Sequence, residues 1–240
     1  SDLVLGVLKR SLVFNSRNEG LGAALNSGAR LALVRGATHL LFLDQDSIPQ
    51  ADMVVQLLEA VNHPERAPIG AVGPYWRDPR TRQRGGGQRG ETAEADFLIT
   101  SGMLVPTGVF DRVGPFDEGL FIDSTDREWC FRARSMGYRL FFVARASLAH
   151  ELGDRPVRLF GRVLRGWAHH SPQRLYYMMR NRVLLYRRNY VPLGWKCHDA
   201  IRAAGKFFAF SVLIGPRLAN GRWMLMGLWD GLRGKTGPFA

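Results

Sequence analysis

The stretch that decides the fold is Leu40-Leu41-Phe42-Leu43-Asp44-Gln45-Asp46-Ser47, in which four apolar residues are followed at once by two acids one residue apart. Such a run predicts a buried strand with Asp44 and Asp46 at its carboxyl end. In an open α/β sheet, ligands bind just outside the carboxyl ends of the strands. Side chains alternate along a strand, so both carboxylates can point the same way and offer hard oxygen ligands to a divalent cation. The alternative is a solvated turn, where Asp and Ser are common.

The composition narrows the class of protein. A chain of 240 residues is long enough for one large domain or two small ones. Its net charge of +12 predicts an anionic partner, which is a nucleotide, a nucleic acid or an anionic membrane surface. The two cysteines, Cys130 and Cys197, lie far apart and indicate neither a disulfide framework nor a zinc site, which fits a reducing, cytoplasmic compartment. No uninterrupted apolar run of about 18 residues predicts a transmembrane helix, and no signal peptide is visible.

Helical and strand patterns alternate around the central stretch, which predicts an α/β fold. Residues 18–34 read as a helix with Asn18 as its cap and Gly36 as its stop. Glycines inside that helix indicate close approach to a neighbouring strand or to a ligand. The further predicted elements are a helix from Pro49 to near Val61, a strand over 69–73, an apolar stretch over 95–106 that contains Thr100-Ser101-Gly102, and a strand over 139–143.

Residues 77–94 are rich in arginine and glycine and almost free of apolar residues. This composition predicts a flexible basic loop. It is either a solvated loop or a segment that folds over a phosphate-bearing ligand.

Acids and apolar residues are densest between Gly114 and Arg134. Ser124 or Thr125 is positioned to cap a helix that runs to Met136, and the helix macrodipole alone favours acids near its start. It does not explain why large apolar residues lie between them. A carboxylate on a hydrophobic platform tends to have a raised pKa and can act as a general base.

His150 follows a predicted apolar strand directly, so its imidazole either reaches the crevice beside Asp46 or has a purely structural role. From residue 156 onward long helical segments dominate, over 172–189, 196–214 and 216–233, with aromatic and basic residues interleaved. They predict either amphipathic helices at an anionic membrane surface or a helical subdomain that packs on the main body or on a second subunit.

Taken in order, these motifs resemble a known family. They run from Asn18-Glu19-Gly20 through Leu43-Asp44-Gln45-Asp46-Ser47 and Thr100-Ser101-Gly102 to Phe121-Ile122-Asp123, Asp126-Arg127-Glu128-Trp129-Cys130 and His150, and close with Arg180-Asn181. The set resembles the family-2 inverting glycosyltransferases with the GT-A fold, and within them the bacterial rhamnosyltransferases. The likeness covers nearly the whole chain. It implies a GT-A catalytic domain over 1–155, a mixed sheet flanked by helices, and a basic helical extension over 156–240.

The resemblance also implies roles for individual residues. Asn18, Gly20 and Asp44 would lie on the donor nucleotide, and Asp46 and His150 would hold Mg²⁺ or Mn²⁺ on its diphosphate. Asp126 would be the catalytic base. The residues implied on the sugar and acceptor side are Thr100, Ser101, Gly102, Asp123, Glu128 and Trp129.

The implied reaction is transfer of a sugar, with L-rhamnose from dTDP-L-rhamnose as the leading donor, to a hydroxyl of a cell-surface polysaccharide or lipid-linked glycan precursor. The implied location is cytoplasmic, on the inner face of the plasma membrane. Family members usually begin with a base-binding strand and a second strand that ends in Asp-Asn. Residues 3–14 offer only one candidate element and no Asp-Asn, so a preceding βαβ unit is expected to be absent from this chain.

Three alternatives compete with this reading. The first keeps the fold with another donor, such as galactofuranose or a hexose. The second is a basic nucleic-acid-binding module, although no nucleic-acid motif is present and the acids cluster centrally, so no nucleic acid beyond the nucleotide is expected. The third is a non-catalytic, membrane-associated scaffold.

Overall fold

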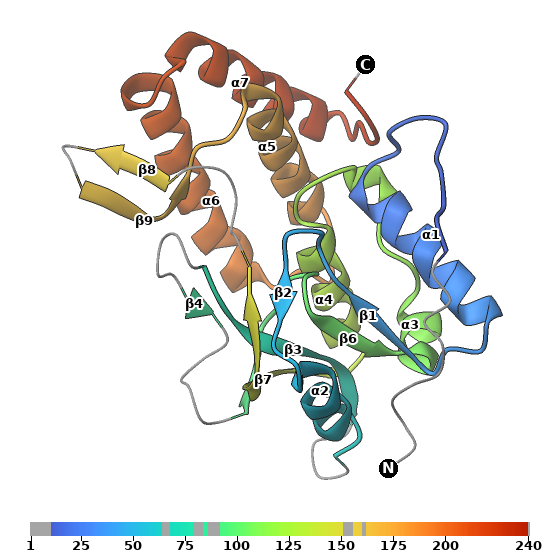
Figure 1. Cartoon of the computed structure of the whole chain (residues 1–240). Helices are drawn as coiled ribbons and strands as arrows, with labels where there is room; N and C mark the ends of the chain where they lie inside the picture. The colour runs from blue at the N-terminus through green and yellow to red at the C-terminus, as the bar shows by residue number, and fades with distance from the viewer. Residues whose placement is uncertain are drawn as a thin grey trace.

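A mixed β-sheet forms the centre of the computed structural model, which describes residues 11–63, 68–78, 84–85, 92–150, 156–159 and 162–239 (Figure 1). Its main path is β1-β6-β3-β7-β2, with β4 beside β3 and β5 beside β7. The strands are β1 (His39–Phe42), β2 (Ile48–Pro49), β3 (Ile69–Arg77), β4 (Arg84–Gly85), β5 (Ala93–Glu94), β6 (Met103–Pro106) and β7 (Arg139–Ala149). β3 and β7 are parallel, whereas the other pairs are antiparallel. The predicted α/β class with a mixed sheet is confirmed.

The central stretch forms β1, which pairs with β6 at one end of the described strand order. Leu40 and Phe42 are buried on one face, and Leu41 lies partly buried on the other. Leu43 falls beyond the strand and is 41% exposed. The strand and its acidic carboxyl end are therefore as predicted, but the strand is one residue shorter at that end.

Helices cover both faces of the sheet. On one face α2 (Met53–Val61) packs its apolar side on β3, β6 and β7. On the other face lie α1 (Leu21–Val34), α3 (Thr107–Val113) and α4 (Thr125–Ser135), which bury Phe42, Phe110 and Trp129 in a shared core. Successive residues of β3, such as Ala71 and Val72, face opposite cores, as strand geometry requires.

Two predicted helix starts are wrong. α1 begins after Gly20, because the Asn18 carboxamide accepts from the Gly20 N–H at 3.0 Å and stays outside the helix. Pro49 lies in β2, paired with Leu148 of β7, and α2 starts only at Met53. In both places a polar or proline residue suited to a helix start forms a turn or a strand edge instead.

The C-terminal part contains β8 (Pro156–Leu159) and β9 (Arg162–Ala168), an antiparallel hairpin that the sequence patterns did not predict. It is followed by α5 (Pro172–Tyr186), α6 (Leu193–Phe208), the π-helical turn η3 (Ala209–Leu213) and α7 (Arg217–Leu232). α5 and α7 lie against each other, since a Cβ on Gly227 would meet the Tyr176 carbonyl oxygen at 2.3 Å. In the part of the chain that the structure describes, no helix is long and apolar enough to cross a membrane.

The aromatic residues of α5 pack inward. Tyr176 and Tyr177 are 0% and 3% exposed, and Arg180 between the helices is completely buried. The α5 helix therefore packs against the rest of the protein, as the subdomain alternative expects. Along α7, Leu218, Leu225, Trp229 and Leu232 remain more than half exposed.

Candidate active site

Three side chains meet at the carboxyl ends of β1 and β7. The His150 Nε2 atom lies 3.7 Å from Asp44 Oδ2, and its Nδ1 atom lies 3.3 Å from Asp46 Oδ1. One ligand atom from each of the three residues falls within 4.8 Å of the others. Asp44 and Asp46 are partly exposed while His150 is buried, so the cluster opens to solvent on its acidic side. The structure thus brings together the residues predicted to hold a metal ion.

Two serines form hydrogen bonds with residues of this cluster. The Ser47 hydroxyl lies 3.0 Å from His150 Nδ1 and is hydrogen-bonded to the Ser101 hydroxyl. Ser101 is only 1% exposed, and its hydroxyl also accepts a hydrogen bond from the Asp44 N–H at 3.5 Å. A hydrogen-bonded ligand has fewer orientations to lose, so these contacts pre-orient His150 and the Asp44 backbone.

The donor set fits a hard divalent cation. Burial raises the pKa of Asp44, the proximity of His150 lowers it, and Asp46 raises it again, so the two acids repel each other when both are ionised. A divalent cation removes that repulsion, and two carboxylate oxygens with one imidazole nitrogen suit Mg²⁺ or Mn²⁺.

The segment that leads into α4 has an unusual backbone. Phe121, Asp123 and Ser124 have φ values of 62°, 67° and 65°, in the left-handed region that non-glycine residues rarely adopt. The segment runs from the short 3₁₀ helix η2 (Glu118–Leu120) to the first turn of α4. Such conformations persist only where the surroundings fix them, and they gather at functional sites.

Two adjacent buried residues of α5 hold that segment. The Asn181 Nδ2 group donates to the carbonyl oxygens of Leu120, Ile122 and Asp123 at 2.9, 2.7 and 2.9 Å. Arg180 Nη2 donates to the Gly119 and Leu120 carbonyls at 3.1 and 3.0 Å. The C-terminal helices thereby fix the chain just before Asp126.

Asp126 stands in the first turn of α4, where its Oδ1 atom accepts from the Arg127 N–H at 2.7 Å. Burial raises the pKa of this carboxyl, partly opposed by the Arg127 charge and N–H. A carboxylate with a raised pKa is a better proton acceptor than an ordinary one. The structure therefore gives Asp126 the environment expected of a general base.

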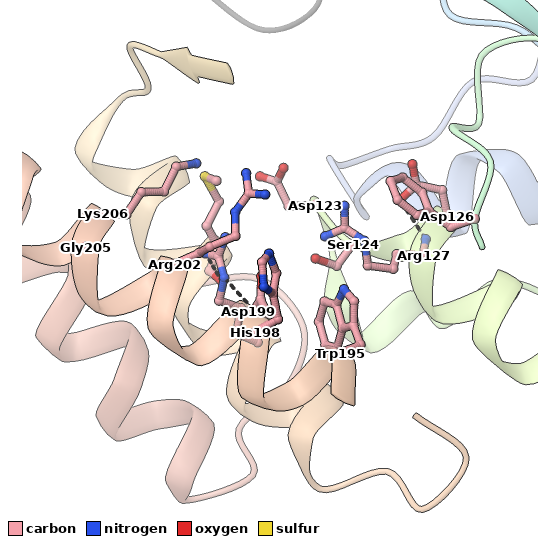
Figure 2. A pocket seen from close by; sticks show the side chains of 13 residues that line it. Asp123, Ser124, Asp126, Arg127, Trp195, His198, Asp199, Arg202, Gly205 and Lys206 are labelled. Atoms are coloured by element: carbon pink, nitrogen blue, oxygen red, sulfur yellow. Dashed lines mark hydrogen bonds and ion pairs between the residues drawn. The ribbon is translucent and has the colours of Figure 1, made fainter. Parts of the chain in front are cut away.

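Asp126 lines a cavity of about 800 Å³ between α4 and α6 (Figure 2). Asp123, Ser124 and Arg127 line it on the α4 side, and the Arg127 guanidinium stacks 4.5 Å from the centre of the Phe97 ring. The opposite wall comes from α5 and α6 and holds Met178, Arg182, Trp195, His198, Asp199, Arg202, Gly205 and Lys206. A cavity of this size, with charged residues on both walls, suits a polar small molecule.

The cluster of Asp44, Asp46 and His150 does not line this cavity, but a short segment of chain connects the cluster to the cavity wall. Phe97 belongs to the cavity wall and Ser101 to the cluster. Four residues of extended chain span at most about 14 Å, so the Phe97 edge of the cavity lies no farther than that from Ser101.

Two predicted site residues, Glu128 and Trp129, have other roles in the structure. Glu128, 1% exposed, forms an ion pair with Arg132 at 2.9 Å and accepts from the Tyr190 hydroxyl. Trp129 is fully buried, with Nε1 donating to the Gly114 carbonyl at 2.9 Å. The prediction that these two residues line the acceptor side is wrong, because both belong to the core.

Two glycines of the predicted site pack closely against other parts of the protein. Gly20 (φ 92°) lies under Phe121, whose carbonyl oxygen a Cβ at Gly20 would meet at 2.4 Å. Gly102 (φ 86°) precedes β6 and packs on the Pro74 ring, where a Cβ would meet Cγ at 2.4 Å. Thr100 beside it is 5% exposed. Most of the basic loop predicted over 77–94 lies outside the described residues.

The cavity residues of α5 and α6 were missed, since they follow Asp126 by 50 to 80 positions and carry no motif. A usable pattern was present in the four-residue spacing of His198, Arg202 and Lys206, which places all three on one face of a helix.

Solved structures share this fold. S. aureus TarS superposes with a TM-score of 0.59 at 14% identity, covering 92% of this chain and 38% of that chain. A second structure, of TarS residues 1-349, superposes with a TM-score of 0.52 at 12% identity, covering 92% of this chain and 74% of that chain. The architecture is therefore that of the GT-A glycosyltransferases.

Sequence comparison gives the family itself. Residues 7–112 match the model of Glycosyl transferase family 2. The chain is 31% identical over 254 residues to the dTDP-rhamnosyl transferase RfbF of Shigella flexneri, covering 98% of this chain and 83% of that protein. The chain belongs to glycosyl transferase family 2. Asp44, Asp46 and Ser101 lie within the matched residues, whereas Asp126 and His150 follow them.

Proposed function

We propose that the chain transfers L-rhamnose from dTDP-L-rhamnose, with inversion, to a hydroxyl of a polysaccharide or lipid-linked glycan precursor of the cell surface. The donor is inferred from the Shigella flexneri relative, whose name specifies dTDP-rhamnosyl transfer. The observation that carries the mechanism is the arrangement of the Asp44, Asp46 and His150 cluster near a cavity lined by Asp126.

In this proposal Asp46 and His150 hold Mg²⁺ or Mn²⁺, and Asp44 lies beside the donor ribose. The bound ion would neutralise charge on the departing nucleoside diphosphate. Ser47 and Ser101 keep His150 and Asp44 oriented for that task. Asn18 and Gly20 remain proposals for the donor side, and Thr100, Ser101 and Gly102 for the sugar side.

Asp126 would accept the proton of the acceptor hydroxyl as its oxygen attacks the anomeric carbon. The bond from that carbon to the diphosphate oxygen breaks on the opposite face, which inverts the configuration. Asp126 ends protonated and the nucleoside diphosphate leaves, so no sugar-enzyme bond is needed. The raised pKa of Asp126 and its place on the cavity wall support this role.

Turnover of a panel of nucleotide sugars, with and without Mg²⁺ or Mn²⁺, tests the proposal. Release of dTDP from dTDP-L-rhamnose, and a product whose anomeric configuration by NMR is opposite to the donor's, is the expected result. Faster turnover of a galactofuranose or hexose donor would reassign the sugar. Turnover that does not depend on added metal would remove the ion from the mechanism, and no turnover of any donor would overturn the transferase assignment for this chain.

We also propose that the protein works at the inner face of the plasma membrane, held there peripherally. Leu218, Leu225, Trp229 and Leu232 form an exposed apolar stripe on α7, and they are spaced by seven, four and three residues, so they share one helix face. Arg222 is exposed in the same helix. An apolar face with basic neighbours, on a chain of net charge +12, fits an anionic lipid surface.

The division into a catalytic domain over 1–155 and a helical region over 156–240 is likewise a proposal. The contacts of Arg180 and Asn181 with residues 119–123 make the two regions interdependent.

A further inference from the structure

One face of α6 presents a row of basic side chains to the cavity. His198, Arg202 and Lys206 are spaced by four residues and all line the cavity opposite α4. Figure 2 shows Arg202 and Lys206 extending from α6 toward the space that Asp126 and Arg127 approach from the other side. At 1.5 Å per residue, eight residues of helix extend the row over about 12 Å.

Two acids of the cavity, Asp123 and Asp199, already have arginine partners, so they balance the charge of this row only in part. Asp123 is paired with Arg174 at 3.1 Å. Asp199 is paired with Arg182 at 2.9 Å and accepts from the Tyr186 hydroxyl at 2.7 Å. Over the described ranges of the chain, neither Arg202 nor Lys206 forms an ion pair or a hydrogen bond.

The lysine is not an ordinary solvated surface charge. Its side chain is only partly exposed, and burial together with Arg182 and Arg202 lowers the pKa of Lys206 to about 8, although the charges of Asp123 and Asp199 oppose that shift. Withdrawing an ammonium from water beside two guanidinium groups is unfavourable unless an anion compensates. An anion bound to the row would offset the unfavourable free energy of burying the Lys206 ammonium.

We propose that Arg202 and Lys206, with His198, form a subsite for a phosphate-bearing group of the acceptor, on the cavity wall opposite Asp126. A row of about 12 Å is longer than one carboxylate needs, and two cations without a direct ion-pair partner among the described residues match the charge of a diphosphate or of neighbouring phosphates. Binding the acceptor's anionic part on α6 directs the neutral, hydroxyl-bearing part toward Asp126. Its identification as acceptor rests on the proposed transferase function, whereas phosphate binding itself does not.

Binding of inorganic pyrophosphate, measured by calorimetry on the full chain in EDTA, tests the subsite without any turnover. We expect the parent protein to bind pyrophosphate and the double variant Arg202→Gln/Lys206→Gln to bind it at least tenfold more weakly. The matched control is Arg35→Gln/Arg112→Gln, which removes two exposed arginines elsewhere and should bind like the parent. Equal binding by parent and Arg202→Gln/Lys206→Gln, or equal weakening in the control, would overturn the proposal.

Two further arms identify the source of the phosphate and its role. If the group belongs to a lipid carrier, farnesyl diphosphate should bind at least tenfold more tightly than pyrophosphate; similar affinities would assign it to a glycan-borne phosphate. In transfer assays, Arg202→Gln/Lys206→Gln should raise the acceptor KM at least tenfold while the donor KM stays unchanged. A raised donor KM would instead place the donor's diphosphate on α6 and overturn the acceptor assignment. Lack of transfer by the parent would refute the proposed function but leave the pyrophosphate result standing.

Discussion

The side-chain amide of Asn181 donates to the carbonyl oxygen of Asp123 at 2.9 Å, across 58 residues of sequence. The same Nδ2 group also serves the Leu120 and Ile122 carbonyls. One buried amide of α5 thus fixes a left-handed stretch of backbone three residues before Asp126. A helix outside the sheet therefore determines where the proposed catalytic base stands.

Replacing Asn181 by Leu should reduce stability and, beyond that, activity. The change removes the donor of the Ile122 and Asp123 carbonyls, while Arg180 still serves the Leu120 carbonyl, and it should cost about 1–3 kcal/mol in the free energy of unfolding. Urea unfolding and transfer rates corrected for the folded fraction would measure both effects. Asn220→Leu is a matched control, because Asn220 also donates to two buried carbonyls, of Phe210 and Ile214, away from α4. A corrected rate equal for both variants would contradict a positioning role for Asn181.

Two glycines of the same region should respond to alanine in opposite ways. Gly20→Ala should destabilise the protein, since its φ is 92° and the new Cβ would meet the Phe121 carbonyl oxygen at 2.4 Å. Gly28→Ala, in the interior of α1 with nothing within 4 Å, should stabilise it by about 0.5–1 kcal/mol. Thermal unfolding of both variants checks the pair. Similar shifts of Tm in the two variants would show that the contact with Phe121 is not what constrains Gly20.

Asp126→Asn should lower kcat by about 100-fold or more, as expected for loss of a general base. It should also stabilise the protein near neutral pH. Because the folded-state pKa is raised, the folded protein holds the Asp126 proton more tightly than the unfolded chain does, so stability falls as pH rises from the ordinary carboxyl pKa through the raised one. The asparagine variant should lack that fall. Unfolding curves over the mildly acidic range measure it, and an unchanged pH slope in Asp126→Asn would count against the raised pKa.

Metal binding should depend on the three-residue cluster. Asp46→Asn and His150→Ala should each weaken Mn²⁺ affinity at least tenfold, and Ser47→Ala should weaken it less, since Ser47 only orients the imidazole. Electron paramagnetic resonance titration of Mn²⁺ gives the affinities. Asp111→Asn, an exposed acid on α3, is the control and should bind like the parent. Lowering the pH should also weaken binding, because the raised pKa of Asp44 allows protons to compete with the ion. Uniform affinities across all variants would rule out the cluster as the binding site.

The α7 stripe should bind anionic vesicles. Leu225→Gln/Trp229→Gln should reduce co-sedimentation with vesicles containing phosphatidylglycerol several-fold, because both side chains are more than half exposed. Val34→Gln/Met136→Gln, a change of two exposed apolar residues on other elements, should have no effect. If the stripe instead covers a second copy of the chain, the parent would be dimeric by analytical ultracentrifugation and its vesicle binding would be insensitive to the Leu225→Gln/Trp229→Gln change.

Local patterns predicted the elements that bury one face and end in polar residues. β1, β3 and β7 follow from apolar runs, α4 follows from its capping residue Ser124 or Thr125, and His150 was found because it follows β7. Errors occurred where one residue type serves two purposes. Pro49 suits both a first helical turn and a strand edge, and only its pairing with β7 decides between them.

The metal-type cluster was predictable because its acids adjoin one strand, whereas the cavity was not. Glu128 and Trp129 adjoin Asp126 in sequence, yet helical rotation turns both into the core. Lys206 reaches the cavity only through the packing of α6 near α4, a long-range contact with no local trace. Arg180-Asn181 was noticed as a motif of the resemblance, but the role of Asn181 was not predictable, because its three acceptors lie about 60 positions earlier.

The cavity wall that faces Asp126 is formed mainly by α6, while Asp44, Asp46 and His150 follow the ends of strands β1 and β7. If α6 binds the acceptor as proposed, mutations along that helix after gene duplication can alter which molecule is glycosylated without disturbing how the activated sugar is held. Diversity in surface glycans then requires only a few exchanges on one helix rather than a new enzyme.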